Sequence, residues 1–264
     1  MPSAADWLGL SPVAPGRWSF ELTPDLSRFD GMLYGGTGLA VVTAVAEAQT
    51  GRDALWSTVQ FVSSAEVGER LDIHLEVLAQ GKRTTQLRLT GLAGDRVVLA
   101  ALAATGEPRS NGLELQIGEI PLVSGPDDSP EWTPRVPFAI PEDNRGWLGS
   151  VDLRGARPAE GSSVGPGLTL WARMRSTSTS RASLGFVADM VPSAVVRAAG
   201  RTGGGSSLDN TIRFGPAPTT DWVLIELDPQ IASSGYVHGA ARLWGADGTL
   251  LAVASQTAVA IHFD

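Results

Sequence analysis

The sequence predicts an α+β protein made of two similar units in tandem, each an antiparallel sheet wrapped around one central helix. Three observations predict this class: an order of elements that occurs twice, a proline-rich segment between the two occurrences, and strand-length segments with alternating apolar residues. The chain has 264 residues, enough for two domains of ordinary size. We expect an N-terminal unit at residues 1–106, a connection at 107–150 and a C-terminal unit at 151–264.

The first unit is expected to contain one strand, one helix and then four strands. Residues 18–22 are strand-like, and 36–49 form an apolar helix that opens with the pair Gly35-Gly36. In the segment 71–78, apolar residues recur at every second position, as in a strand with one buried face. The other expected strands span 55–62, 84–92 and 96–104.

The second unit has the same order of elements. Its expected strands span 168–175, 208–214, 222–227, 236–244 and 250–261, and its helix spans about 190–199. The last two strands flank Ala246-Asp247-Gly248, which is typical of a hairpin turn. Alternate positions of the last strand are alanines, which allow a helix to approach the sheet closely.

A long connection is predicted between the two units. Residues 107–150 hold seven prolines, which remove backbone donors and favour extended conformations. An offset of 153 residues places Trp18 on Trp171, Leu55 on Leu208 and Leu71 on Leu224. We therefore expect two units that superpose at this offset, with their sheets joined edge to edge.

Composition excludes several classes of protein. The net charge of −8 argues against a nucleic-acid-binding protein, and the absence of cysteine excludes disulfides and thiolate metal sites. The three histidines are isolated in strands without metal-ligand spacing, so we expect no metal and no cofactor. No segment resembles a signal peptide or a membrane span, and we expect a cytoplasmic protein.

Three polar residues distinguish the second half from the first. At the offset of 153, Asp189 replaces Gly36, Ser207 replaces Ala54 and Gln256 replaces Ala103. Each has a plain structural alternative: Asp189 as a helix N-cap, Ser207 as the first residue of a strand, and Gln256 as a solvent-facing residue. In a sheet that wraps a helix, however, the three positions can converge at one end of that helix.

These residues lie in motifs that resemble the acyl-CoA thioesterase II family of double hot-dog proteins. The motifs are Phe186-Val187-Ala188-Asp189, the segment Ser207-Leu208-Asp209-Asn210-Thr211-Ile212-Arg213-Phe214, and Ala254-Ser255-Gln256. The segment Leu170-Trp171-Ala172-Arg173 and the pair Gly35-Gly36 are also similar to that family.

The resemblance implies a tandem (double) hot-dog fold and the hydrolysis of acyl-CoA to a fatty acid and CoA. It implies that Asp189 is the base, with Ser207 and Gln256 holding the attacking water; serine departs here from the threonine common in the family. Gly36, with Gly35, is the expected oxyanion donor, because N–H groups at a helix N-terminus are unpaired. Asp209 is an alternative base that the sequence leaves open.

Two other functions compete with hydrolysis. One is a hot-dog enoyl-thioester hydratase, which would need a histidine beside the helix start, and the other is an acyl-CoA-binding protein without activity. Hot-dog sheets leave a broad outer face and free edge strands, so we also expect a homo-oligomer. We expect one productive acyl-CoA site in each chain, because only the second half retains the three polar residues.

Overall fold

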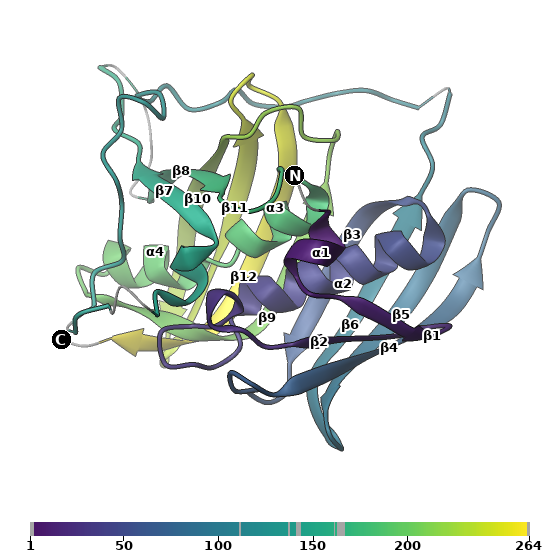
Figure 1. The fold of residues 1–264 in the computed structure, drawn as a ribbon. Coiled ribbons are helices and arrows are strands. Elements are labelled where there is room, and N and C mark those ends of the chain that lie inside the picture. The colour runs from purple at the N-terminus through teal and green to yellow at the C-terminus, as the bar shows by residue number, and fades with distance from the viewer. Residues whose placement is uncertain are drawn as a thin grey trace.

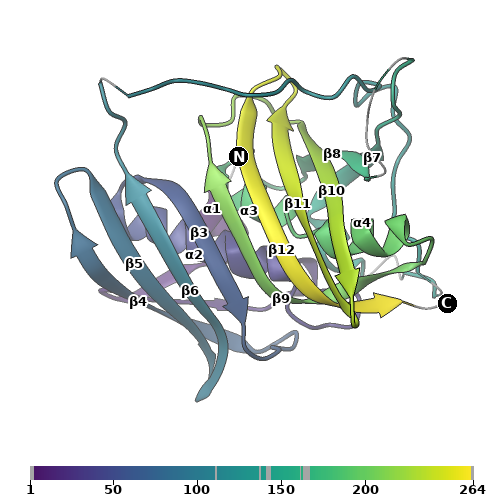
Figure 2. The same cartoon turned by 180° about the vertical axis from the view of Figure 1, so that it is seen from behind.

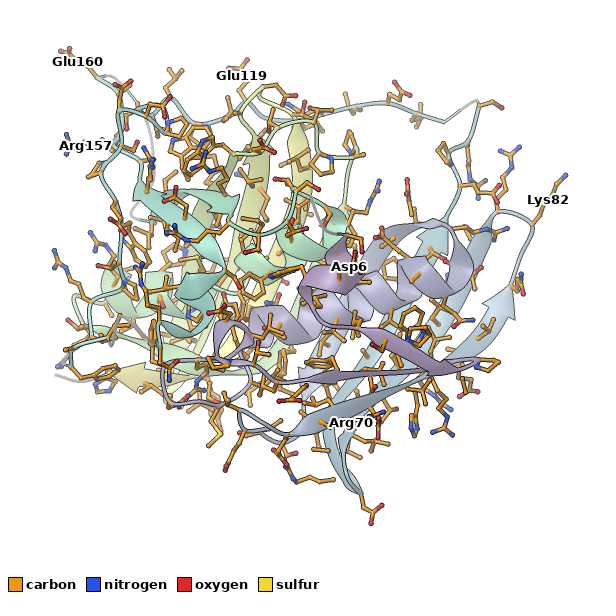
Figure 3. The ribbon with its side chains drawn as sticks, in the orientation of Figure 1. Asp6, Arg70, Lys82, Glu119, Arg157 and Glu160 are labelled. Atoms are coloured by element: carbon orange, nitrogen blue, oxygen red, sulfur yellow. The ribbon has the colours of Figure 1, made fainter. Side chains whose placement is uncertain are left out.

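The protein is one large antiparallel sheet with its helices against one face (Figure 1). The computed structural model describes residues 3–110, 112–136, 138–140, 144–160, 162 and 167–262. Across these residues the strand order is β1-β2-β4-β5-β6-β3-β9-β12-β11-β10-β8-β7. The opposite, outer face of the sheet is open along most of its width (Figure 2). Charged side chains such as Lys82, Glu119 and Glu160 lie at the exposed periphery (Figure 3).

Each half contributes six strands to this sheet. The first half comprises α1 (Ala4–Trp7), β1 (Ser11–Ala14), β2 (Arg17–Glu21), a 3₁₀ turn η1 (Pro24–Leu26), α2 (Gly35–Thr50), β3 (Asp53–Phe61), β4 (Arg70–Gln80), β5 (Thr84–Ala93) and β6 (Arg96–Gly106). The second comprises a 3₁₀ turn η2 (Gly146–Gly149), β7 (Val151–Gly155), β8 (Thr169–Met174), α3 (Arg181–Val187), α4 (Val191–Ala198), β9 (Gly203–Phe214), β10 (Val223–Ser233), β11 (Tyr236–Gly245) and β12 (Leu250–His262).

Helix α2 is the central helix of the first half, as predicted. All residues from Gly35 to Ala46 are buried, which fits a helix that is apolar on every side. The helix ends at Gly51, whose left-handed backbone (φ 63°) allows its N–H to bond the Glu47 carbonyl. The concave face of the sheet therefore wraps around this helix.

The two halves join where β3 pairs with β9 at the centre of the sheet. Thr58 pairs with Thr211, and these residues are 153 positions apart in the sequence. On either side of this pair, Trp56 faces Arg213 and Gln60 faces Asp209, as expected for two similar units related by a twofold axis. The predicted edge-to-edge junction and its offset are confirmed at the centre of the sheet.

The offset changes by one residue in the outer strands. Leu71 packs in the main core, whereas Leu224 and Trp171 belong to a separate cluster on the outer face. Phe20 pairs with Leu71 in the first half, and Ala172 pairs with Val223 in the second. The expected equivalences of Trp18 with Trp171 and of Leu71 with Leu224 are therefore wrong by one position.

The second half has two short helices where the sequence predicted one. Helix α3 begins with a reciprocal capping box between Ser180 and Ser183 and ends at Val187, and α4 starts at Val191. Pro192 explains the interruption, because its ring has no N–H and would clash with the carbonyl of Ala188 in a continuous helix. The single helix expected at 190–199 thus corresponds to α4, and α3 was missed.

The described part of 107–150 contains no α-helix and no strand of the sheet, only η2 and isolated bridges. It passes along the edge of the molecule between the halves (Figure 2) and covers the outer cluster with Ile120 and Val123. Gln116 ties it to the β11–β12 turn through Gly248 O (3.1 Å) and Leu250 N (2.7 Å). The boundaries 1–106, 107–150 and 151–264 stay predictions.

Candidate active site

Asp189 lies in the break between α3 and α4, and its side chain is buried. The N-cap residue of α4 is Met190, and no side chain caps that helix. The alternative of Asp189 as a helix N-cap is therefore wrong. The break turns the carboxylate away from the helix and towards the sheet.

A β-bulge places Ser207 beside this carboxylate. In β9 the pairing with β12 shifts between Asp209 and Ser207, so Leu208 is an extra residue and faces outwards. Without the bulge, Ser207 and Asn210 would point to opposite faces, because side chains alternate along a strand. The first half has the same shift at Leu55, so the bulge is a shared feature of both units.

Three side-chain donors converge on one oxygen of Asp189. Ser207 Oγ lies 3.3 Å from Oδ1 and Asn210 Nδ2 lies 3.1 Å from it. Gln256 Nε2 also donates to Oδ1, and it lies 2.8 Å from Ser207 Oγ. The structure therefore brings Asp189, Ser207 and Gln256 together, and the alternative of a solvent-facing Gln256 is wrong because only 1% of that residue is exposed.

The first half contributes the N-terminus of α2 to the same site. The Gly36 N–H donates to the Asp189 carboxylate, and the Tyr34 hydroxyl donates to the Asp189 carbonyl at 3.3 Å. A Cβ on Gly35 would lie 2.7 Å from Asp189 Oδ2, and one on Gly36 would clash with the Phe186 carbonyl. Glycine is thus required at both positions for the two halves to approach each other.

The environment of Asp189 stabilises the neutral, protonated form of its carboxyl group to a greater extent than bulk water would. Burial raises the pKa of Asp189 from its ordinary value of 3.8 to about 7, against the opposing effect of hydrogen bonds from Asn210, Gly36, Ser207 and Gln256. A carboxyl group with a pKa near neutrality can accept and release a proton at physiological pH. Burial also raises the pKa of Tyr34 well above its usual range, so this phenol remains a donor.

The first-half counterpart of Asp189 is Thr43 rather than Gly36. Thr43 is the ninth residue of α2, and Asp189 is the ninth residue counted from the start of α3. Thr43 Oγ1 contacts Ser57 Oγ at 3.1 Å, and Ser57 is 153 positions before Asn210. Register supports the other two equivalences: Ser57 faces Ala103 as Asn210 faces Gln256, and Ala54 precedes the bulge as Ser207 does.

Asp209 lies outside this constellation. It follows the bulge residue on the outer face of β9, and its Oδ1 accepts the Thr257 N–H at 2.9 Å. Its neighbour across the junction is Gln60. The geometry therefore supports Asp189 over Asp209 as the acid–base residue.

No histidine contacts the Asp189 carboxylate among its described partners. His74 contacts Arg17 on the first-half sheet, and His238 Nδ1 lies 3.2 Å from Thr257 Oγ1. Within the described ranges, no group of three or more His, Asp or Glu side chains is close enough to hold a metal ion. Likewise, no helix in the described part of the chain is long and apolar enough to cross a membrane.

Sequence reasoning missed two neighbours of Asp189, namely Asn210 and Tyr34. Asn210 could have been found, because the offset of 153 that gave Ser207 and Gln256 also aligns it with the smaller Ser57. Tyr34 gave no such signal, because it precedes the helix of the other half.

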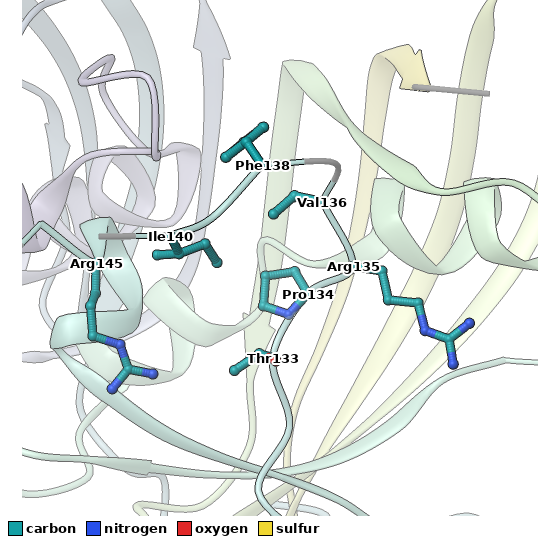
Figure 4. A pocket seen from close by; sticks show the side chains of 7 residues that line it. All are labelled: Thr133, Pro134, Arg135, Val136, Phe138, Ile140 and Arg145. Atoms are coloured by element: carbon teal, nitrogen blue, oxygen red, sulfur yellow. The ribbon is translucent and has the colours of Figure 1, made fainter. Parts of the chain in front are cut away.

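A surface cavity of about 670 Å³ lies in the connection, not at Asp189. Its lining residues are Thr133, Pro134, Arg135, Val136, Phe138, Ile140 and Arg145 (Figure 4). Aromatic contacts connect the cavity to the site: Phe138 contacts Phe29, and Phe29 contacts Trp147. Trp147 stacks on Tyr34 with ring centroids 4.8 Å apart. We therefore assign the site from the side chains around Asp189 rather than from this cavity.

Solved structures define the class of this protein. A candidate thioesterase from Novosphingobium aromaticivorans is 30% identical, with a TM-score of 0.84 over 96% of this chain and 98% of its own. A hot-dog protein from Alicyclobacillus acidocaldarius has the same fold (TM-score 0.82, 21% identity, 100% and 99% coverage). So does an acyl-CoA thioesterase II from Mycobacterium marinum (TM-score 0.75, 18% identity, 99% of each chain). The α+β double hot-dog fold is therefore confirmed.

Family models identify the family. A model of the acyl-CoA thioesterase N-terminal domain matches residues 22–106, and one of the C-terminal domain matches residues 122–260. The chain belongs to the acyl-CoA thioesterase family and is a thioester hydrolase. Among curated proteins, none matches it at a significant level.

Proposed function

We propose that this protein hydrolyses acyl-CoA to a free fatty acid and CoA, with Asp189 as the general base. The observation that carries the proposal is the convergence of Ser207, Asn210 and Gln256 on one buried carboxylate with a pKa of about 7. An acid–base group is most effective when its pKa is near the working pH. Membership of the acyl-CoA thioesterase family supports the choice of substrate.

In the proposed reaction, Asp189 takes a proton from a water molecule as the water oxygen attacks the thioester carbonyl carbon. Ser207 and Gln256 hold this water by hydrogen bonds. The tetrahedral intermediate then expels the CoA sulfur, which receives the proton from Asp189. No covalent enzyme intermediate is needed, because a thioester is a good electrophile, and general-base assistance contributes roughly 10² to 10⁴ in rate.

The N-terminus of α2 is the proposed binding site for the thioester carbonyl. Gly35 and Gly36 open this helix, where N–H groups lack partners within the helix. The Gly36 N–H donates to Asp189, so proton uptake by Asp189 weakens that bond as charge develops on the carbonyl oxygen. Loss of one oxyanion donor typically costs roughly 10² to 10³ in turnover.

The test is release of CoA thiol from a panel of acyl-CoA substrates of increasing chain length. We expect Asp189→Asn to lower turnover by about 10² or more. Asp209→Asn is the matched control, because that carboxylate is on the outer face of β9, away from the Asp189 site, and it should keep near wild-type turnover. Full activity in Asp189→Asn, with loss in Asp209→Asn, would reverse the assignment.

The two competing functions are tested in the same experiment. Hydration of crotonyl-CoA without thiol release would indicate a hydratase, although no histidine is a described partner of Asp189. Saturable binding of acyl-CoA without either reaction would indicate a binding protein. We favour hydrolysis because Ser207, Asn210 and Gln256 all donate hydrogen bonds to the Asp189 carboxylate.

We also propose that the protein forms a homo-oligomer through the outer face of its sheet and acts in the cytoplasm. Exposed apolar side chains flank the central junction on that face, namely Leu55, Leu102, Leu208 and Val253. In the connection, Leu113, Leu115 and Ile117 are between 79% and 102% exposed. Apolar surface of this kind commonly marks a contact with another chain.

A further inference from the structure

Asn210 is the most deeply buried side-chain donor to the candidate base. None of its surface is exposed, and its Nδ2 lies 3.1 Å from Asp189 Oδ1. It is on β9 between β3 and β12, where it pairs with Val59 and with Gln256. Its position is therefore fixed from both sides by the central strands of the sheet.

The other two donors have a second role in the proposed reaction. Ser207 is only half-buried and, with Gln256, is the proposed ligand of the attacking water. When these two side chains turn towards water, each gives up part of its bond to Asp189. Asn210 is then the side-chain donor that remains on Oδ1.

An asparagine here is not explained by packing. Ser57 holds the equivalent position in the first half, and its hydroxyl is paired with Thr43. The Asn210 Oδ1 atom, in contrast, is buried without a partner among the residues that the structure describes, as is Gln256 Oε1 on the adjacent strand. An unpaired buried polar atom destabilises a protein, so its presence beside a candidate base indicates a functional demand.

We propose that Asn210 is a positioning residue that holds Asp189 ionised and correctly turned while Ser207 and Gln256 bind the water. This inference rests on the proposed function, because it assigns Asn210 a role through the base. A donor to an ionised carboxylate stabilises the charged form, so it opposes the effect of burial. Without Asn210, Asp189 should take up a proton more readily.

The experiment compares Asn210→Leu and Asn210→Ser with the wild type. Leucine keeps the volume and removes the donor, and serine introduces the residue of the first half at the equivalent position. Ser57→Ala is the matched control, since it alters the equivalent position beside Thr43. Thermal unfolding of all three variants establishes that they are folded.

The first readout is the pH dependence of kcat/KM for CoA release. In Asn210→Leu, we expect the rising limb to move up by about one pH unit, since a hydrogen bond to a charged group is worth about that much. The activity of this variant should fall by about fivefold at pH 7 and recover at pH 9, with KM changed less than about twofold. Asn210→Ser should move the limb less, because a serine hydroxyl at this position can still donate, as Ser57 pairs with Thr43 in the first half. Ser57→Ala should keep the wild-type profile.

The second readout does not depend on hydrolysis. The Asp189 carboxyl is titrated by ¹³C NMR, with its signal assigned by its absence in Asp189→Asn. A higher pKa in Asn210→Leu supports the inference, and an unchanged pKa in that variant overturns it. If the wild type releases no CoA while the pKa still moves, the proposed function fails and the role of Asn210 in holding Asp189 ionised stands.

Discussion

Replacing Asp189 by asparagine should make the protein more stable at alkaline pH while it removes activity. The folded-state pKa of this carboxyl is about 7, and its ordinary value is 3.8. Below pH 3.8 the group is protonated in both states, so it makes no difference to stability. Between these values the unfolded chain releases the proton and the folded chain keeps it, so the free energy of unfolding falls as pH rises.

The size of the effect follows from the same two values. Each pH unit between them costs about 1.4 kcal/mol, so the loss reaches about 4 kcal/mol above pH 7. Asparagine does not ionise and avoids this loss. Its amide N–H₂ would face the Gly36 N–H, however, so part of the gain is offset by two donors in contact.

Urea denaturation of the wild type and of Asp189→Asn, from pH 5 to pH 8, measures this difference. We expect the variant to gain stability relative to the wild type with rising pH and to level off above pH 7. Thiol release by the same samples should be lower by about 10² or more at pH 8, and the difference should narrow towards pH 5, where Asp189 of the wild type is mostly protonated. A difference in stability that is constant across this range would refute the raised pKa, whatever happens to activity.

Four further outcomes are expected. Gly35→Ala should reduce turnover by about tenfold or more, because its Cβ would lie 2.7 Å from the Asp189 carboxylate; normal turnover would contradict the close approach. Ser207→Ala and Gln256→Ala should each cost less than Asp189→Asn and add little to it; a double variant whose losses multiply would oppose a shared role. Calorimetry with a non-hydrolysable acyl-CoA analogue should give one site per chain. Two equal sites would refute the prediction that only the second half provides the polar residues of a site. Leu102→Ser should lower the oligomer mass in sedimentation, because Leu102 is exposed on the outer face of the sheet, and a wild type that is monomeric at micromolar concentration would exclude the oligomer.

Much of the fold could be predicted because it depends on local patterns. Alternating apolar residues gave the strands, and the apolar segment after Gly35 gave α2. The site could be predicted in part because Ser207 and Gln256 replace small residues at a constant offset along paired strands. That offset holds only where β3, β6, β9 and β12 share one register.

The rest of the fold and of the site depends on tertiary contacts, which the periodicity of apolar residues does not encode. Helix α3 is short and is held by its packing on α2, so it lacks a clear pattern of its own. The interruption before Pro192 shifts the helices of the two halves relative to the strands, which is why Gly36 was matched to Asp189 in place of Thr43. Tyr34 reaches the site from the other half, and nothing in its sequence neighbourhood indicates that contact.

The junction of β3 with β9 also determines how the site responds to dilution. Gly36 and Asp189 come from different halves, so the site exists only while the halves are docked. In two separate subunits, docking would weaken as the protein is diluted. Here both halves belong to one chain, and the tether keeps their effective concentration on the order of millimolar. Activity per chain should therefore be the same at nanomolar and micromolar protein, unless the oligomer itself contributes to turnover.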